Sequence, residues 1–189
     1  MRWIATLFLL AAPLAAQNVR VRMETQLGMI EIDVDAAHAP VTAANFMKYV
    51  DGGLYDGGAF HRTVKPDNQP QSKIRIQVVQ AGTNPERRGQ ELAPVGLERT
   101  SQTGLKHQDG VISMARSGPD TATSDFFICI GDQPSLDFGG MRNPDGQGFA
   151  AFGRVVQGMD VVRRIQQAPA EGQNLKPPVR IVTARRAGR

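Results

Sequence analysis

Cysteine is almost missing from this sequence: its 189 residues include a single one, Cys129. One thiol cannot close an intramolecular disulfide, and it excludes metal sites that are built from several thiolates. Cys129 lies in the apolar stretch DFFICIG, which predicts a buried and unreactive thiol. The three histidines, His38, His61 and His107, have no metal-ligand spacing among them. We therefore expect neither a metal site nor a cofactor.

Common signatures of hydrolytic and nucleotide-binding enzymes are also missing. The chain has no G-x-S-x-G elbow, no H-E-x-x-H and no P-loop. The segment GQGFAA, residues 146–151, fits a loose dinucleotide-binding pattern, but it follows a loop and leads into a strand-like stretch, which is the wrong context. A secreted hydrolase that uses scattered Ser, His and Asp residues lacks any supporting spacing.

Positive charge is modest and dispersed. The 22 Lys and Arg residues stand against 18 Asp and Glu residues, a net charge of +4. Only small basic clusters occur, such as Arg185-Arg186, and no basic stripe is interleaved with aromatic residues. We therefore expect a mildly basic, solvated surface and no nucleic-acid partner.

The N-terminal stretch MRWIATLFLLAAPLAAQ reads as a targeting segment. It has one early positive charge, Arg2, then an apolar run from Trp3 to Leu14 and two small residues. This order is typical of a secretory signal peptide, and the run is too short for a comfortable transmembrane span. A buried N-terminal helix and an uncleaved anchor are the alternatives. We predict a signal peptide over residues 1–16 and a mature domain over 17–189, periplasmic or secreted, with no stable membrane association after cleavage.

Hydrophobic periodicity in the rest of the chain predicts many short strands and two helices. Residues 19–34 alternate around Gly28, which predicts a hairpin with one buried face. One helix is expected to begin at Pro40 and another to cover residues 160–167. The apolar residues at helical spacing in the first are Val41, Ala44, Met47 and Val50. Short apolar runs, no repeat and no linker favour one mainly β domain, a closed antiparallel barrel or a sandwich.

Four segments resemble one protein family in both residues and order. They are FHR (60–62), VVQAG (78–82), GVISMARSGPDTATSDFFICIGD (110–132) and FAAFGRVVQGMDVV (149–162). Together they resemble the cyclophilin family of peptidyl-prolyl cis-trans isomerases, over nearly the whole mature length. The resemblance implies a closed eight-stranded antiparallel β-barrel capped by two α-helices. It also implies a cofactor-free isomerase that acts on proline-containing unfolded or newly exported polypeptides; we expect it to be a monomer.

The chemistry explains why an arginine stands beside aromatic residues in FHR with no carboxylate next to it. Amide resonance opposes rotation by about 18–20 kcal/mol, and X–Pro bonds isomerise over roughly tens to hundreds of seconds. No bond is made or broken. A donor aimed at the prolyl nitrogen helps because that lone pair becomes basic only when the amide twists, that is, in the transition state. A guanidinium stays charged and carries rigid donors, and the resemblance places this catalytic role on Arg62.

The resemblance also assigns a pocket for the proline ring. Phe127 would form its floor, because Phe126 and Phe127 must point to opposite faces of one strand, one to the barrel interior and the other to the groove. The walls would be Val78, Leu136 and Phe149. Plain core packing is the alternative interpretation of these apolar residues.

Polar groups around that pocket would hold the peptide. Gln80 would orient Arg62 and meet a substrate carbonyl, and the backbone of Ala115 and Arg116 would bind the peptide that precedes proline. Asp125 stands where the family often has glutamine. This carboxylate could pair with Arg62 and either position it or draw it away from substrate.

Other departures from the family pattern affect the depth of the proline pocket, the binding of cyclosporin and the length of the loop after Arg62. Gln77 and Val78 replace a frequent Phe-Met pair and make the pocket shallower, and Phe149 replaces a histidine. Ser135 replaces a tryptophan that contacts cyclosporin, so we expect weak cyclosporin affinity. The loop Lys65–Ile76 is lengthened and reads as a surface excursion beside the groove, either a tolerated insertion or a substrate-gripping element.

The competing function is a non-catalytic, cyclophilin-like peptide-binding or chaperone module. Asp125, Gln77 and the long loop support that alternative. The combination of Arg62, Gln80 and Phe127 favours the enzyme, since a module that only binds has no need for a donor at the prolyl nitrogen.

Overall fold

The computed structural model describes residues 18–87 and 89–188. The predicted signal peptide, residues 1–16, lies outside the described residues. Among the helices that are described, none combines the length and the apolar character that a membrane crossing requires.

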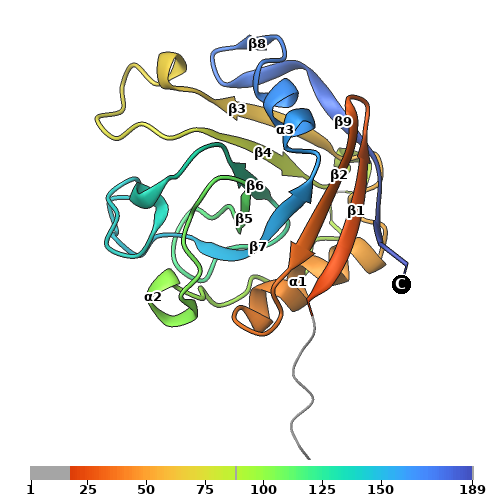
Figure 1. The fold of residues 1–189 in the computed structure, drawn as a ribbon, viewed down its shortest axis with the longest axis horizontal. Helices are drawn as coiled ribbons and strands as arrows, with labels where there is room; N and C mark the ends of the chain where they lie inside the picture. The colour runs from red at the N-terminus through yellow and green to blue at the C-terminus, as the bar shows by residue number, and fades with distance from the viewer. Residues whose placement is uncertain (1–17, 88, 189) are drawn as a thin grey trace, which may run out of the picture.

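Eight antiparallel strands close into a barrel (Figure 1), which confirms the predicted architecture. In chain order they are β1 (Val19–Thr25), β2 (Gly28–Val34), β3 (Ala59–Val64), β4 (Val78–Gly82), β5 (Val111–Met114), β6 (Phe126–Cys129), β7 (Ala150–Gln157) and β9 (Asn174–Arg186). Their spatial order is β1-β2-β7-β5-β6-β4-β3-β9, and a pairing between β1 and β9 closes the ring. A two-residue strand, β8 (Ala170–Glu171), pairs only with β9. Closure leaves no unpaired edge in the barrel wall.

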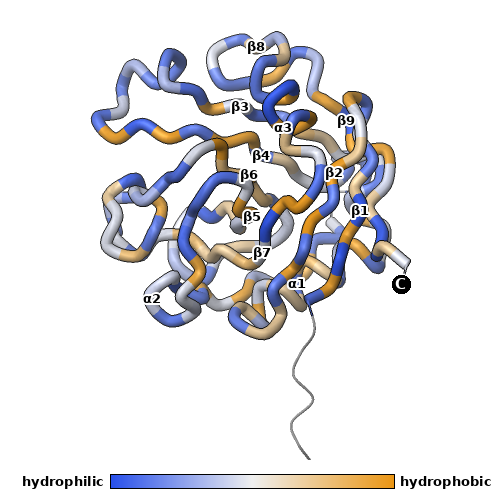
Figure 2. Tube along the Cα trace, viewed as in Figure 1, coloured by the Kyte–Doolittle hydropathy of each residue, from blue (hydrophilic) through white to orange (hydrophobic). Residues whose placement is uncertain are grey.

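The predicted N-terminal hairpin is confirmed: β1 and β2 pair around Gly28. Val19 pairs with Val34 at one end and Thr25 with Gly28 at the other. Gly28 has φ +131°, in the region that favours glycine. Hydropathy alternates along these strands (Figure 2) because successive side chains point to opposite faces.

Within the described residues three α-helices accompany the barrel, where two were expected. α1 (Pro40–Asp51) and α3 (Met159–Gln166) lie at opposite ends of it (Figure 1), and both were predicted. α2 (Thr100–Thr103) is a single turn that ends at Gly104, which has φ +76°. It was missed because four residues are too few to show a hydrophobic period.

The apolar face predicted for α1 was right at Met47 and Val50, which are buried, and wrong at Val41 and Ala44. Val41 is 48% exposed and Ala44 is also exposed. The helix instead buries Phe46 and Tyr49, together with the polar residues Thr42 and Asn45. Asn45 is tolerated there because its Nδ2 donates to the main-chain oxygen of Thr123 at 2.6 Å.

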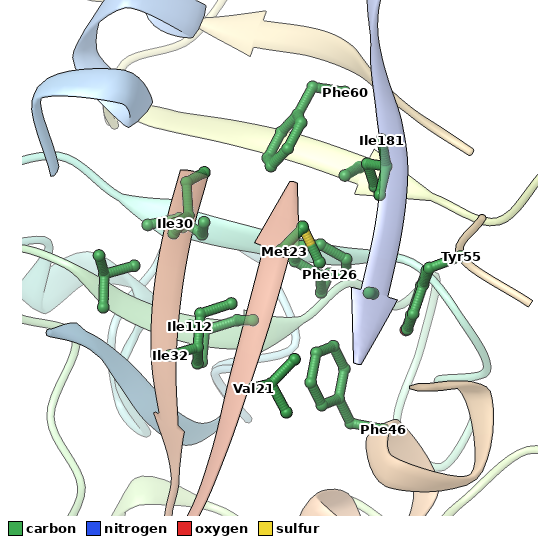
Figure 3. Packing of buried hydrophobic residues seen from close by; sticks show 14 of the residues in the cluster. Val21, Met23, Ile30, Ile32, Phe46, Tyr55, Phe60, Ile112, Phe126 and Ile181 are labelled. Carbon is green, nitrogen blue, oxygen red and sulfur yellow. The ribbon is translucent and has the colours of Figure 1, made fainter. Parts of the chain in front are cut away.

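Aliphatic and aromatic side chains together fill the barrel interior (Figure 3). Phe126 stands at their centre and meets Phe46, Tyr55 and Phe60 edge-to-face, with ring centroids 5.4–6.0 Å apart. A second, smaller apolar cluster lies on the other face of β4 and β6. Its members are Val64, Ile76, Val78, Phe127, Cys129 and Leu136. Phe126 and Phe127 therefore face different cores, as predicted from their adjacency on one strand.

Candidate active site

The outer face of β3, β4 and β6 forms one wall of a pocket of about 220 Å³. Arg62 of β3 pairs in register with Gln80 of β4, and Gln80 pairs in turn with Phe127 of β6. This volume is below the roughly 300–1,000 Å³ of sites for drug-sized ligands, so it suits a single side chain of a longer peptide. The lining residues are Arg62, Ile76, Val78, Gln80, Ala115, Arg116, Phe127, Leu136, Arg142, Asn143 and Phe149. All the predicted site residues except Asp125 are among them.

Arg62 is fixed by neutral acceptors. Its Nε and Nη2 donate to Oε1 of Gln173 at 2.9 and 2.6 Å, and its Nη1 donates to Oε1 of Gln80 at 3.1 Å. Within residues 18–87 and 89–188, no carboxylate forms a salt bridge with it. Burial lowers the pKa of Arg62 from its ordinary value, but a guanidinium remains protonated at neutral pH. The pocket therefore carries an oriented positive charge that no ion pair neutralises.

Asp125 does not pair with Arg62, and that possibility was wrong. Its Oδ2 accepts a hydrogen bond from Nε2 of Gln80 at 3.1 Å and lies 3.6 Å from Nε2 of His61. A side chain at position 82 would collide with Oδ1, so Gly82 leaves the room that this carboxylate occupies. Asp125 thus touches Arg62 only through Gln80, in a neighbouring hollow that also borders Ala115.

The apolar lining is rigid because it is buried and braced by aromatic contacts. Phe127 is 4% exposed, Val78 3% and Leu136 1%. Phe149 meets Phe127 edge-to-face at 5.4 Å, and the imidazole of His107 stacks behind Phe127 at 6.0 Å. The residues expected to be floor and walls come together in one place.

A buried Ser–His–Asp array supports this floor. His107 Nδ1 lies 2.8 Å from Oδ1 of Asp137, and its Nε2 lies 3.0 Å from Oγ of Ser113. The spacing resembles that of a hydrolase triad, which the sequence gave no reason to expect. Ser113 is 0% exposed, however, so its oxygen cannot reach a substrate. The array is a structural network beneath the pocket.

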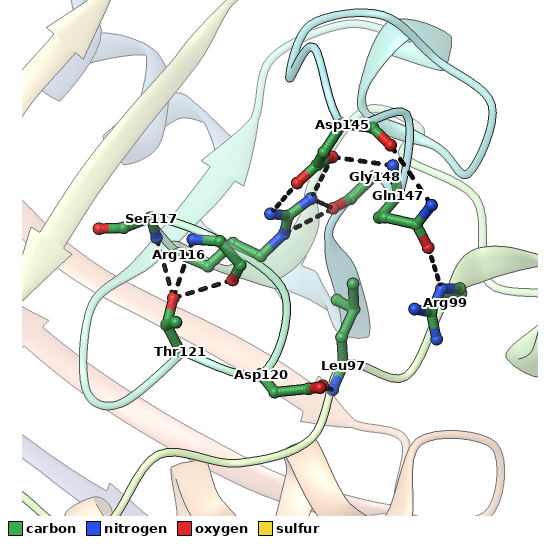
Figure 4. Close-up of polar contacts among 10 residues, drawn as sticks. Leu97, Arg99, Arg116, Ser117, Asp120, Thr121, Asp145, Gln147 and Gly148 are labelled. Atoms are coloured by element: carbon green, nitrogen blue, oxygen red, sulfur yellow. Dashed lines mark hydrogen bonds and ion pairs between the residues drawn. The ribbon is translucent and has the colours of Figure 1, made fainter.

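Arg116 also lines the pocket, and Figure 4 shows the polar contacts of its side chain. Its guanidinium is fully buried, donates to both oxygens of Asp145 at 2.7 and 3.0 Å, and also donates to the main-chain oxygen of Gly148. It lies over the ring of Phe149, 5.0 Å from the centroid. Since residue 116 as a whole is half-buried, its exposed part is the backbone, the part expected to bind peptide.

Four residues at or beside the pocket were not predicted. Ile76, Arg142 and Asn143 line it, and Gln173 orients Arg62. Arg142 and Asn143 belong to the loop that precedes Phe149, and Gln173 lies 111 positions from Arg62 in the chain. The only usable signal was the lengthened loop Lys65–Ile76, because Gln69, Ser72 and Ile74 of that loop hold Arg142.

These residues permit binding and orientation but not proton transfer or nucleophilic attack. No Ser, Thr, Cys, Lys, His, Asp or Glu is among the residues that line the pocket in the described chain. What remains is a cavity with an apolar floor, formed by Val78, Phe127 and Leu136, and with the guanidinium groups of Arg62 and Arg142 among its polar lining. Such a site suits an enzyme that rearranges a bound peptide without making or breaking a bond.

Comparison with known proteins agrees with that class. The family model for cyclophilin type peptidyl-prolyl cis-trans isomerase/CLD matches residues 20–186. A peptidyl-prolyl cis-trans isomerase of Acinetobacter baylyi is 34% identical over 181 residues, 93% of this chain and 89% of the relative. Peptidyl-prolyl cis-trans isomerase A of Dickeya dadantii is 38% identical over 158 residues, 83% of this chain and 76% of the relative.

A solved structure shows the same fold. A cyclophilin type isomerase of Cryptosporidium parvum, in the presence of the dipeptide Ala-Pro, matches with a TM-score of 0.71 at 20% identity, over 90% of this chain and 99% of that one. The chain belongs to the cyclophilin-type peptidyl-prolyl cis-trans isomerase family. It is an enzyme that isomerises peptide bonds preceding proline.

Proposed function

We propose that this isomerase accelerates the folding of exported polypeptides, as a monomer, with Arg62 as its catalytic donor. The observation that carries the proposal is the guanidinium of Arg62, held by Gln173 and Gln80 at an apolar pocket without a carboxylate partner. In this role Arg62 donates to the prolyl nitrogen as the amide twists. The proline ring occupies the cavity above Phe127, between Val78 and Leu136.

The free energy of a single hydrogen bond limits how much rate acceleration Arg62 can supply alone. A hydrogen bond to a charged group contributes about 1.5–3 kcal/mol, and each 1.36 kcal/mol changes a rate about tenfold. Arg62 therefore supplies roughly a ten- to hundredfold acceleration or somewhat more. The rest comes from the dry pocket, because a twisted amide is less polar than a planar one and is favoured where water is excluded.

The polar groups beside the pocket set the direction in which the peptide chain runs across it. In our proposal the backbone at Ala115 and Arg116 binds the residue before proline, and Gln80 meets its carbonyl. The Cryptosporidium parvum relative was solved in the presence of Ala-Pro, a dipeptide of the class that we assign to this pocket. The residue before proline then lies toward Asp125, and the residue after proline leaves on the opposite side.

Export is proposed from residues 1–16, which have the order of a signal peptide. The full-length gene, expressed with a C-terminal tag in a Gram-negative host, tests this proposal. We expect the tagged protein in the periplasmic fraction with an N-terminus close to Gln17. A protein that keeps Met1 and stays in the cytoplasm would contradict export and leave the isomerase activity unaffected.

The catalytic role is tested by cis-trans exchange of a short Ala-Pro peptide, measured by NMR. We expect Arg62→Ala to lose at least about tenfold in kcat/KM, with an unchanged melting temperature. Arg75→Ala is the matched control, because Arg75 is exposed in the following loop and does not line the pocket. Full activity of a folded Arg62→Ala variant would overturn the assignment.

A further inference from the structure

A second guanidinium, that of Arg142, lines the pocket beside Arg62. We propose that Arg142 binds a substrate carboxylate on the C-terminal side of proline, so that the enzyme prefers Pro followed by an acidic residue. This inference rests on the proposed direction of the peptide along the groove. It adds a specificity-determining residue that takes no part in twisting the amide.

The loop Lys65–Ile76 holds Arg142 in place. Nη1 of Arg142 donates to Oε1 of Gln69 at 2.9 Å, to Oγ of Ser72 at 2.7 Å and to the main-chain oxygen of Ile74 at 2.6 Å. Gln69 is only 3% exposed, and its amide also bonds the main chain at Lys65 and Ile76, which closes the loop on itself. A guanidinium held this way loses little conformational freedom when it binds a ligand.

The remaining donors of Arg142 are free for a ligand. In the described chain its Nε and Nη2 make no hydrogen bond, and no carboxylate forms a salt bridge with it. Asp145, in the same loop, is occupied by Arg116. Burial lowers the pKa of Arg142, and the positive charge of Arg62 lowers it further. Two neighbouring cations without a counter-ion favour an anionic ligand over a neutral one.

The order of residues along β4 decides which side of proline the carboxylate occupies. Val78, Gln80 and Gly82 are spaced by two and share one face of β4, and Ile76 lies two residues before the strand. The Gly82 end borders Asp125, whereas Ile76 lines the pocket together with Arg142. The groove is therefore negative where the preceding residue lies and positive where the following residue leaves. An acidic side chain after proline matches this polarity, and one before proline opposes it.

The test compares two blocked peptides, acetyl-Ala-Ala-Pro-Glu-Ala-amide and the same peptide with Gln in place of Glu. NMR exchange gives kcat/KM for both, and a titration followed by chemical shifts gives both Kd values. For the wild type we expect the Glu peptide to be favoured about fivefold, a size suited to a partly exposed ion pair, and the preference to shrink in high salt. Arg142→Gln should bring the Glu-to-Gln ratio close to one.

Because Arg142 also anchors a loop, the Glu-to-Gln ratio is the decisive quantity. A loosened loop would weaken the binding of both peptides alike and leave that ratio unchanged. Arg75→Gln removes a positive charge from the same loop without altering the pocket, and it should keep the preference. A peptide with Glu before proline should gain nothing. Equal rates and affinities for the two peptides in the wild type, or a ratio that Arg75→Gln lowers as much as Arg142→Gln, would overturn the inference. Turnover of the Gln peptide reports on the isomerase by itself, so the two failures are distinguishable.

Discussion

One oxygen atom, Oε1 of Gln173, accepts hydrogen bonds from both Nε and Nη2 of Arg62, at 2.9 and 2.6 Å. Gln173 is anchored in turn, since its Nε2 donates to the main-chain oxygen of Asn68 at 3.1 Å. A neutral amide can fix the plane of a guanidinium without neutralising its charge. The lengthened loop after β3 thus supports both cations of the pocket, Arg62 through Asn68 and Gln173 and Arg142 directly.

Removing this positioning residue should slow turnover with little effect on peptide binding. We expect Gln173→Ala to lower kcat about tenfold, because a hydrogen bond to a charged group contributes about 1.5–3 kcal/mol, while KM stays nearly constant. Combined with Arg62→Ala, it should cost nothing further, since both changes act on one donor. Gln71→Ala, in an exposed position of the same loop, is the control. Additive losses in the double variant would show that Gln173 acts elsewhere.

The two adjacent phenylalanines of β6 should separate folding from function. Phe126→Ala opens a cavity among the ring contacts of the barrel core and should cost about 3–5 kcal/mol of unfolding free energy. Phe127→Leu should cost much less and instead raise KM for proline peptides, because it alters the pocket floor. Urea unfolding and NMR exchange measure the two effects. A Phe127→Leu enzyme with unchanged KM would return Phe127 to plain core packing.

The sequence predicted this pair well because alternation along a strand is a local property. It predicted the buried face of α1 only in part, correctly at Met47 and Val50, for an equally physical reason. Thr42 and Asn45 are buried on that helix, and Asn45 donates to the distant carbonyl of Thr123, so neither polar residue gave a hydrophobic signal. Val41 and Ala44 carry that signal although they face solvent. Periodicity therefore fails where hydrogen bonds replace apolar contacts.

The site residues divide in the same way, into those that local strand geometry places and those that come from distant loops. Residues inside the four family-like segments lie together, because strand register brings Arg62, Gln80 and Phe127 side by side. Gln173 and Arg142 come from loops whose path no local pattern specifies, and their partners lie 111 and 73 positions away. Asp125 was misjudged because Gln80 stands between the carboxylate and Arg62.

Weak cyclosporin binding stays a prediction, and the structure gives the position of the residue on which it depends. Ser135 lies in the short 3-10 turn Pro134–Leu136, next to the wall residue Leu136. A serine there cannot supply the indole contact that the resemblance associates with the drug. Inhibition of the wild type should require micromolar or higher concentrations, and Ser135→Trp should tighten it at least about tenfold, about 1.4 kcal/mol. Sub-micromolar inhibition of the wild type would contradict this.

The thiol of Cys129 should be unreactive in the native enzyme. The residue is 0% exposed in the cluster under the pocket, and burial strongly raises its pKa. Because the thiolate is the reactive form, a disulfide reagent at pH 8 should label it only as fast as the protein unfolds. Labelling should become rapid and complete in denaturant. Fast labelling under native conditions would mean that the pocket floor opens readily.

Acid should destabilise the closure of the barrel near the C-terminus. Arg185 and Arg186 of β9 form salt bridges with Asp56 and Asp51, and hydrogen bonds from these arginines lower the pKa of each carboxylate. A carboxylate whose pKa is lower in the folded state contributes stability above its unfolded pKa of about 3.9, and that contribution is lost as the pH falls through the folded value. Unfolding free energy should therefore drop below about pH 4.

Asp56→Asn is the informative variant for this acid transition. Asp56 is the more enclosed of the two carboxylates, with 22% side-chain exposure against 47% for Asp51, and it also accepts from the main-chain nitrogen of Ala184. The substitution should lower stability at pH 7 by up to about 1 kcal/mol and flatten the decline between pH 5 and 3. Asp160→Asn removes an exposed carboxylate on α3 and should leave the profile unchanged. If Asp56→Asn kept the full acid decline, the loss would have to arise from other carboxylates.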